Sequence, residues 1–121
     1  MKLNCHCGAV QSEINATINE LAKIVRFNCS ICKRKNATIV MFKNEDFKII
    51  EGEDKLKLYQ YHTKVTNHYF CNECGIYIHH NPRSAPAITN FNLGCVDEVK
   101  VEDLEEVAYF DGLNHPMDQE K

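Results

Sequence analysis

The cysteines are the residues of this sequence whose types and spacing are best suited to chemistry. There are seven among 121 residues, and six of them stand in pairs one or two positions apart. They are Cys5 and Cys7, Cys29 and Cys32, Cys71 and Cys74, and the single Cys95. Two thiolates at such spacing can both reach a metal ion about 2.3 Å from each sulfur. Disulfide frameworks spread their cysteines more widely, so the spacing favours metal binding.

Inert thiols and disulfides account for the cysteines less well. Buried cysteines can serve as inert apolar side chains, and disulfides require an oxidising compartment. Three close pairs in one short chain favour metal binding over both, and an all-thiolate tetrahedral site selects zinc. Nucleophilic catalysis by a cysteine of lowered pKa ranks below metal binding.

The spacing alone leaves open which pairs share a metal ion. Between Cys7 and Cys29 lie 21 residues, close to the gap of about 15–20 that is usual in zinc ribbons. A site made from the first and third pairs would instead fasten the N-terminus to the middle of the chain. Since two pairs complete a four-sulfur site, the remaining pair belongs to a second, incomplete site.

Short β-strands are the elements that must position these pairs. Nine segments show alternating polarity or many β-branched and aromatic residues, with turn-forming residues between them. They are Gly8–Ala16, Leu21–Phe27, Ala37–Phe42, Phe47–Ile50, Lys55–His62, Val65–Phe70, Ile76–His80, Ile88–Leu93 and Val107–Phe110. We expect one helical turn at Asp97–Glu106 and a polar tail over Leu113–Lys121.

The size of the chain limits how much the strands can bury. A length of 121 residues and a mass of 14.0 kDa fit one domain. Many short strands give thin sheets, so a bound metal ion supplies folding free energy that the small core lacks. The expected fold class is therefore mainly β, with several short antiparallel sheets stabilised by zinc.

The charge and hydropathy patterns indicate which classes of partner and which cellular location to expect. Lys and Arg number 14 against 17 for Asp and Glu, which gives a formal net charge of −3 and a pI near 6.0. Nucleic-acid binders usually carry a basic stripe, so we expect no nucleic-acid partner. The sequence shows no run of 18 apolar residues and no signal-peptide pattern, and we expect a cytoplasmic protein without membrane association.

Three motifs in a fixed order resemble one protein family. They are Cys5-His6-Cys7-Gly8-Ala9-Val10, Asn28-Cys29-Ser30-Ile31-Cys32-Lys33 and Phe70-Cys71-Asn72-Glu73-Cys74-Gly75, followed by Pro82-Arg83-Ser84, Cys95-Val96-Asp97-Glu98 and Phe110-Asp111-Gly112. The pattern is similar to that of the glutathione-dependent formaldehyde-activating enzymes and centromere protein V, and the later motifs resemble the second branch more closely. We therefore expect one zinc-binding domain over residues 1–115 and a polar tail over residues 116–121.

The resemblance implies a zinc-stabilised fold called Mss4-like or β-tent, with two zinc sites. In the family the Cys-x-Cys pair and the last Cys-x-x-Cys pair share a structural zinc. The corresponding residues here are Cys5, Cys7, Cys71 and Cys74. A second, catalytic zinc is carried by a Cys-x-Cys-x-x-Cys run, of which Cys29 and Cys32 are the last two members.

Phe27 stands where the family's run has its first cysteine. A catalytic zinc takes three protein ligands and keeps one position open, so the third ligand must come from elsewhere or the second metal is absent. Cys95 is the preferred replacement, and His68, His79 and His80 are the alternatives. His79 and His80 are adjacent on an expected strand and point to opposite faces, so at most one of them can face the site.

The activity implied by the resemblance is that of a carbon–sulfur lyase, which condenses formaldehyde and glutathione to S-(hydroxymethyl)glutathione. An open zinc position would hold the substrate thiol as a thiolate beside the aldehyde carbon. Glutathione also carries two carboxylates that need cationic partners. The candidates are Lys33, Arg34, Lys35 and Arg83.

The alternative function is a non-catalytic zinc module that uses the same scaffold to bind a partner. Phe27 favours the module, whereas the presence of Cys29 and Cys32 favours the enzyme. A homodimer is a further expectation, because a short β protein leaves a sheet edge exposed.

Overall fold

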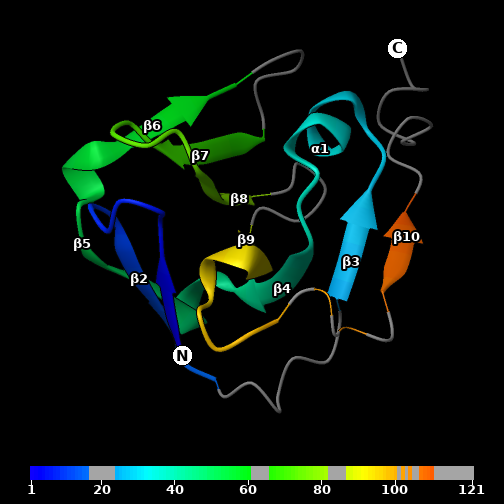
Figure 1. Ribbon diagram of the computed structural model, residues 1–121, viewed down its shortest axis with the longest axis horizontal. Coiled ribbons are helices and arrows are strands. Elements are labelled where there is room, and N and C mark those ends of the chain that lie inside the picture. Colours follow the sequence, from blue (N-terminus) through cyan, green and yellow to red (C-terminus); the bar gives the residue numbers. More distant parts are fainter. Residues whose placement is uncertain are drawn as a thin grey trace.

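β-strands are the main elements of the protein in the computed structural model (Figure 1). The structure describes residues 1–16, 24–60, 66–81, 87–100, 102, 104 and 107–110. Within these residues the strands form one sheet of three strands and one of seven. The mainly β fold expected from the sequence is confirmed.

The smaller sheet is antiparallel, with the order β1–β2–β5. Its strands are β1 (Lys2–Asn4), β2 (Gln11–Ile14) and β5 (Phe47–Glu51). Along β2 the side chains of Ser12 and Ile14 are buried and that of Glu13 is exposed, as in a strand with one face on the core. The turn between β1 and β2 carries Cys5 and Cys7.

The larger sheet contains the remaining strands. In spatial order they are β10 (Ala108–Phe110), β3 (Ile24–Phe27), β4 (Ile39–Lys43), β9 (Ile88–Asn92), β8 (Tyr77–Asn81), β7 (Asn67–Cys71) and β6 (Leu56–Tyr59). Neighbours are antiparallel except for β10 and β3, which are parallel. The parallel pair departs from the antiparallel sheets that we expected. It can form because β4 to β9 lie between these two strands in the sequence, which gives the long crossover that parallel neighbours require.

The main core joins the two sheets. Its buried members are Leu3, Ile14, Val40, Phe91, Leu93, Cys95 and Val96. Leu3 and Ile14 come from the smaller sheet, whereas Val40 and Phe91 are paired residues of the larger one. Burying each large apolar side chain contributes about 1.5–3 kcal/mol to the free energy of unfolding. This cluster therefore stabilises the packing of the two sheets against each other.

The structure also contains a helix that the sequence patterns do not predict. Helix α1 (Ser30–Lys35) has Cys29 as its N-cap, whose Sγ accepts a hydrogen bond from the N–H of Cys32 at 3.4 Å. The helix ends at Asn36, which adopts a left-handed conformation with φ of 52°. Three further one-turn 3-10 helices are η2 (Asn44–Asp46), η3 (Glu53–Lys55) and η4 (Leu93–Cys95).

Most of the expected elements are found. Each of the nine expected strands is present, with ends that differ by a few residues, and the unexpected β1 is only three residues long. The helical turn expected at Asp97–Glu106 is wrong at its start, because Asp97 and Glu98 form a turn and residues 99 and 100 have no regular structure. There the N–H of Val99 bonds to the carbonyl of Val96 at 3.1 Å, and both valines pack on the main core.

Several expected features lie outside the described residues. They are the start of the second expected strand, the ends of two others, the segment with Arg83 and the tail over residues 116–121. Among the helices that the structure describes, none has the length and apolar character needed to cross a bilayer.

Candidate functional site

Four cysteine side chains converge near the ends of both sheets. The sulfur atoms of Cys5, Cys7, Cys71 and Cys74 all lie within 4.8 Å of one another. The Cys5 and Cys7 sulfurs are 3.6 Å apart, and those of Cys7 and Cys71 are 3.7 Å apart. A tetrahedral site with Zn–S bonds of about 2.3 Å places its sulfurs about 3.8 Å apart. This four-cysteine centre therefore has the donor set and the spacing of a closed zinc site.

Two turns of similar construction present these cysteines. We call them the first knuckle (residues 5–10) and the second knuckle (residues 71–76). Gly8 and Gly75 follow the last cysteine of each knuckle and have φ of 80° and 78°, a conformation that glycine adopts without steric cost. The N–H of each glycine donates to the carbonyl of the first cysteine in its knuckle, at 3.3 Å and 2.8 Å respectively. The backbone thus bends so that both sulfurs of each knuckle face the same point.

The connection between β5 and β6 contacts both knuckles. A Cβ on Gly52 would lie 1.9 Å from the carbonyl oxygen of Ala9 in the first knuckle. In the second knuckle the N–H of Asn72 donates to the carbonyl of Lys55 at 2.7 Å, and Lys55 forms an ion pair with Glu73 at 3.3 Å. The backbone therefore brings the knuckles together independently of the sulfurs.

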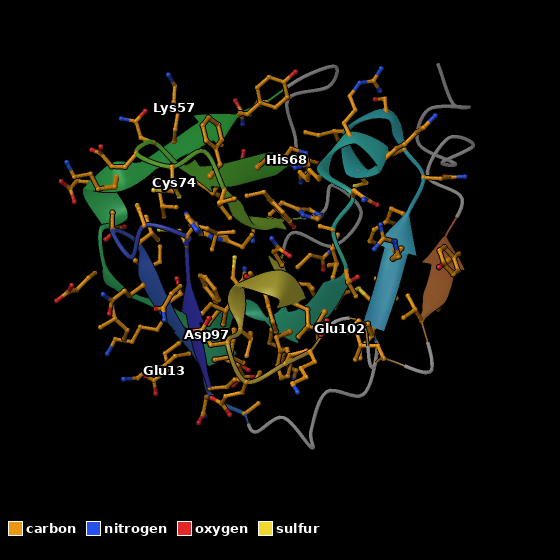
Figure 2. The ribbon with its side chains drawn as sticks, in the orientation of Figure 1. Glu13, Lys57, His68, Cys74, Asp97 and Glu102 are labelled. Carbon is orange, nitrogen blue, oxygen red and sulfur yellow. The ribbon has the colours of Figure 1, made fainter. Side chains whose placement is uncertain are left out.

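Apolar residues cover one side of the four-cysteine centre. Cys5, Val10, Cys71 and Ile78 form a buried cluster, and the N–H of Val10 donates to the Cys5 sulfur at 3.3 Å. Cys7 is exposed, and Figure 2 shows Cys74 near the turn that follows β7. Such a partly shielded site, with an N–H aimed at a sulfur, is the surrounding expected for a thiolate-bound metal ion.

The second cysteine pair is built differently, at the start of α1. Cys29 is half-buried and Cys32 is buried. A hydrogen bond from the Cys32 thiol, the N–H groups of Cys32 and Ile31, and the charge of Lys35 together lower the pKa of Cys29 to about 6 despite its partial burial. The contact with Cys29 and its own burial raise the pKa of Cys32. Cys29 is therefore the thiolate of this pair at neutral pH.

The pair gains no third ligand from Cys95, His68, His79 or His80. Within the described part of the chain, no histidine, cysteine or carboxylate joins Cys29 and Cys32 in a group of three ligand atoms within 4.8 Å of one another. Cys95 instead directs its thiol to the carbonyl of Tyr77 at 3.6 Å and packs in the main core. Phe27 lies on β3 beside β10. Among the described residues the pair therefore supplies two ligands to a metal ion, one fewer than a catalytic zinc takes.

A lysine, two histidines and a tyrosine lie near the pair and form the Lys35 cluster (Lys35, His68, Tyr77 and His80). The Nζ of Lys35 donates to Nδ1 of His68 at 2.7 Å and lies 3.6 Å from the centre of the Tyr77 ring. The Tyr77 hydroxyl is 2.6 Å from Nδ1 of His80, and the rings of His68 and His80 stack 5.0 Å apart. Figure 2 shows His68 between β7 and α1, so the cluster joins the helix to the larger sheet.

A bulge in β8 brings Tyr77 into this cluster. Ile78 is an extra residue with no partner in the register between β7 and β8. The bulge places Tyr77 and His80 on the same face of the sheet. The adjacent His79 lies on the opposite face, where its ring is 4.6 Å from that of Phe47. Of these two histidines, only His80 faces the Lys35 cluster.

Burial sets the charges within the Lys35 cluster. It lowers the pKa of Lys35 to about 8, against the opposing electrostatic effect of the Cys29 and Cys32 pair. Burial and the charge of Lys35 lower the pKa of His68 to about 3 and keep that of His80 well below its usual range. Both histidines are therefore neutral at pH 7, and Lys35 can exchange a proton at a pH close to neutrality.

The sequence predicts this cluster only in part. Lys35 stands in a run of basic residues, His68 and His80 are expected only as alternative metal ligands, and Tyr77 is not among the candidate residues. Lys35 follows Cys32 by three residues, about one helical turn, and that spacing becomes a signal only once α1 is known. Lys33 and Arg34 are exposed.

The sequence model of one known family matches residues 1–110, and its description reads "Glutathione-dependent formaldehyde-activating enzyme". The chain belongs to this family. A crystal structure of a Rhodobacter sphaeroides protein is similar at 38% sequence identity, covering 91% of this chain and 100% of that chain, with a TM-score of 0.84. The family resemblance expected from the three cysteine motifs is confirmed. Membership in this family implies a function like that of the glutathione-dependent formaldehyde-activating enzymes.

Proposed function

We propose that the protein is a carbon–sulfur lyase that joins formaldehyde to glutathione or to another small thiol. The proposal depends chiefly on the match of residues 1–110 to the formaldehyde-activating family. A fold alone would not indicate a reaction. The Cys29 pair and the Lys35 cluster support the proposal by offering a thiolate and a proton-transfer group in neighbouring positions.

The four-cysteine centre is the proposed structural zinc site. Bound zinc would cross-link the two knuckles and add to the folding free energy. The sulfur spacings of 3.6 and 3.7 Å support this assignment. No reaction step is assigned to this centre, because four protein ligands leave no open position for a substrate.

In the proposed reaction a small thiol adds to the carbonyl carbon of formaldehyde and gives an S-hydroxymethyl adduct. A C–S bond forms, the carbonyl π bond breaks, and one proton passes from sulfur to oxygen. Lys35 is the proposed proton carrier, because its pKa of about 8 lies close to that of a small thiol. The neutral amine takes the thiol proton, and the resulting ammonium returns it to the developing alkoxide. His68 accepts a hydrogen bond from Lys35 and so keeps Nζ in place.

Cys29 and Cys32 form the proposed wall of the reaction site. The negative charge of the Cys29 thiolate stabilises the ammonium form of Lys35, and the Cys32 thiol donates to Cys29 and holds it in place. No step is assigned to a metal ion at this pair, since it supplies two ligands where a catalytic zinc takes three. Holding the thiol and the aldehyde together would supply most of the acceleration.

The basic end of α1 is the proposed binding region for the glutathione carboxylates. Lys33 and Arg34 are exposed there, and an Nη1 of Arg34 donates to the carbonyl of Ser30 at 2.9 Å. That bond orients the guanidinium and leaves other donors for a carboxylate. All seven cysteines are free thiols, and we therefore propose a reducing compartment such as the cytoplasm.

A non-catalytic zinc module that binds a partner is the second candidate. Phe27 replaces the first cysteine of the family's run, and the described residues supply no other third ligand near Cys29 and Cys32. In this case the four-cysteine centre would have the same structural role, and the Cys29 pair would carry no reaction.

Formation of the glutathione adduct from ¹³C-formaldehyde, followed by NMR, distinguishes the two candidates. We expect the wild type to accelerate the reaction and Lys35→Met to slow it about 100-fold, as is typical for the loss of a general acid–base group. Lys48→Met is the matched control, because it removes the same charge from an exposed position on β5, outside the proposed binding region. We expect this control to retain the rate.

Zinc content, measured on the same samples, separates lost catalysis from lost structure. Lys35→Met should retain the zinc content of the wild type, since Lys35 belongs to the other site. If fully zinc-loaded wild type gave no acceleration and no saturable glutathione binding, the lyase proposal would be wrong and the module would be favoured.

A further inference from the structure

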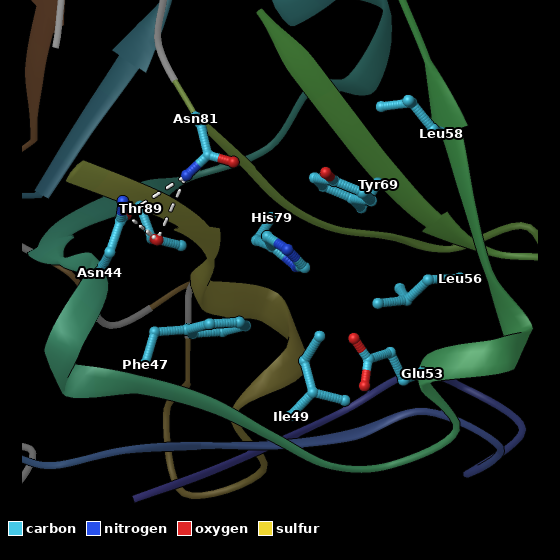
Figure 3. A pocket seen from close by; sticks show the side chains of 10 residues that line it. All are labelled: Asn44, Phe47, Ile49, Glu53, Leu56, Leu58, Tyr69, His79, Asn81 and Thr89. Atoms are coloured by element: carbon cyan, nitrogen blue, oxygen red, sulfur yellow. Dashed lines mark hydrogen bonds between the residues drawn. The ribbon is translucent and has the colours of Figure 1, made fainter. Parts of the chain in front are cut away.

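A cavity of about 390 Å³ lies on the face of β8 opposite the Lys35 cluster (Figure 3). Its walls come from β5 of the smaller sheet, from η2 and η3, and from β6, β7, β8 and β9 of the larger sheet. None of the described residues that line it is a cysteine. The volume falls within the range of about 300–1,000 Å³ that is common for small-molecule sites. The cavity is therefore separate from both cysteine sites and large enough for a ligand.

His79 is the central polar residue of this cavity. Its side chain is 5% exposed, and its ring lies 4.6 Å from the ring of Phe47 and 4.7 Å from that of Tyr69. Its Nδ1 is buried and has no hydrogen-bond partner among the described residues. Figure 3 shows the ring in the middle of the lining side chains. Because buried polar atoms are nearly always paired, this nitrogen points to a ligand that supplies the missing partner.

The polar groups at one end of the cavity have their donors occupied. Thr89 donates to the side-chain oxygen of Asn44 at 2.6 Å, and the amide nitrogen of Asn81 donates to the same oxygen at 3.3 Å and to the carbonyl of Ile88 at 3.1 Å. Figure 3 shows the amide oxygen of Asn81 pointing away from Asn44 and Thr89. This end therefore offers an acceptor to a ligand.

The charge of the lining also favours a donor ligand. Glu53 is the one charged residue among the described residues that line the cavity, and Figure 3 shows its carboxylate beside Ile49. Burial, with a smaller effect of the Lys35 charge, lowers the pKa of His79 to about 4, so its ring is neutral at pH 7. Apart from the polar end, the other lining side chains are apolar or aromatic. Aromatic rings attract cations. This lining opposes an anionic ligand and favours a cationic one.

We propose that this cavity binds a small primary amine as its ammonium ion, with the Glu53 carboxylate and Nδ1 of His79 as acceptors. The apolar body of the amine lies along Phe47, Leu56 and Tyr69, and the amide oxygen of Asn81 accepts from any further donor at the opposite end. An ammonium group has three donors and no acceptor, which matches this lining. The site is independent of the proposed lyase reaction.

Titration of the zinc-loaded full chain with 2-phenylethylamine, followed by ¹⁵N NMR, tests the proposal. We expect saturable shifts at β5, β6 and β8, and no saturable binding of 3-phenylpropanoate, which has a similar body but the opposite charge. Glu53→Gln should weaken amine binding about tenfold, because it removes the ionic acceptor. Glu13→Gln is the matched control, since Glu13 is exposed on β2 and does not line the cavity.

His79→Phe separates ligand binding from structure. Phenylalanine keeps a ring between Phe47 and Tyr69 and removes the unpaired nitrogen, so the variant should remain folded while amine binding weakens. Lack of saturable amine binding by wild type, equal binding of the propanoate, or equal affinity in Glu53→Gln would each overturn the proposal. The formaldehyde assay should give the wild-type rate for Glu53→Gln, so a failed lyase proposal and a failed amine site remain distinguishable.

Discussion

The two cysteine sites differ in how the chain builds them. The four-cysteine centre gathers sulfurs from two knuckles on different sheets, and contacts of Gly52 and Lys55 with the backbone hold these knuckles together. The Cys29 pair needs only the first turn of α1, where the sulfur of Cys29 accepts from the N–H of Cys32. The first site depends on the tertiary structure, whereas the second is local.

This difference in construction predicts a difference in role. Four ligands enclose a metal ion completely, and their loss removes a cross-link between the sheets. The Cys29 pair has two sulfurs, one of them half-buried and of lowered pKa, beside the Lys35 cluster. We therefore expect the four-cysteine centre to stabilise the fold and the Cys29 pair to be chemically reactive. The following experiments test this contrast, beginning with the largest expected effect.

Removing one ligand from each site should give opposite results. We expect Cys74→Ser to lose the structural zinc and to unfold the domain, because zinc binding contributes on the order of 10 kcal/mol in small zinc domains. Cys29→Ser should remain folded and zinc-bound. Circular dichroism and metal analysis of the purified variants measure both effects. Equal losses of thermal stability in the two variants would show that the division into structural and reactive sites is wrong.

Substituting the glycine between the knuckles should destabilise the first site without changing any sulfur. Gly52→Ala would put a Cβ 1.9 Å from the Ala9 carbonyl oxygen, at a φ of 82°. We expect a loss of about 3 kcal/mol in the free energy of unfolding, measured by denaturant titration. Gly75→Ala is the control, since nothing lies within 4 Å of its Cβ and only the positive φ opposes the change, at about 1 kcal/mol. Similar losses would mean that the contact with Ala9 is unimportant.

Acid should act on the Lys35 cluster through His68. Its pKa in the folded state is about 3, below the ordinary value of 6.5, so the unfolded chain binds the additional proton between these values. The stabilisation that comes from keeping His68 neutral is complete above pH 6.5. Below this pH the free energy of unfolding falls by about 1 kcal/mol per pH unit. His68→Asn keeps an acceptor for Lys35 and should reduce the slope of the stability profile between pH 6.5 and 4.5, where the remaining slope comes from His79 and His80. His6→Asn, at an exposed position, should follow the wild type, and an unchanged profile for His68→Asn would contradict the assignment.

The smallest expected effect is on the reactivity of Cys29. In the zinc-loaded protein, iodoacetamide should modify Cys29 first, with half of the maximal rate near pH 6. Lys35→Met removes a positive charge that lowers this pKa, so the rate at pH 6 should fall about twofold. Peptide mapping by mass spectrometry measures the modification of each cysteine. Faster modification of Cys7 than of Cys29 would reverse the predicted contrast between the sites.

Local patterns in the sequence predicted most strands and both cysteine turns. Alternation in Gly8–Ala16 anticipated β2, and the glycines after Cys7 and Cys74 belong to motifs that carried the family resemblance. Such features depend on neighbouring residues, so the sequence contains them directly. Which pairs share a metal ion depended on the resemblance, since spacing alone also favoured the first and second pairs.

The Lys35 cluster could not be predicted in the same way. It needs α1, whose N-cap is a cysteine rather than one of the usual capping residues. It also needs the bulge at Ile78, which places Tyr77 on the face of His80. Neither feature has a distinct local sequence signal, and the bulge depends on the pairing of β8 with β7.

The four-cysteine centre also affects how the chain folds. Its contact between Cys7 and Cys71 closes a separation of 64 residues, and such long-range contacts slow folding. The first knuckle leaves a ribosome well before the second, so the ligands cannot meet until more than half of the chain has been synthesised. Capture of the proposed zinc ion would then be a late step in biogenesis, and a cell short of zinc would accumulate chains that have not completed folding.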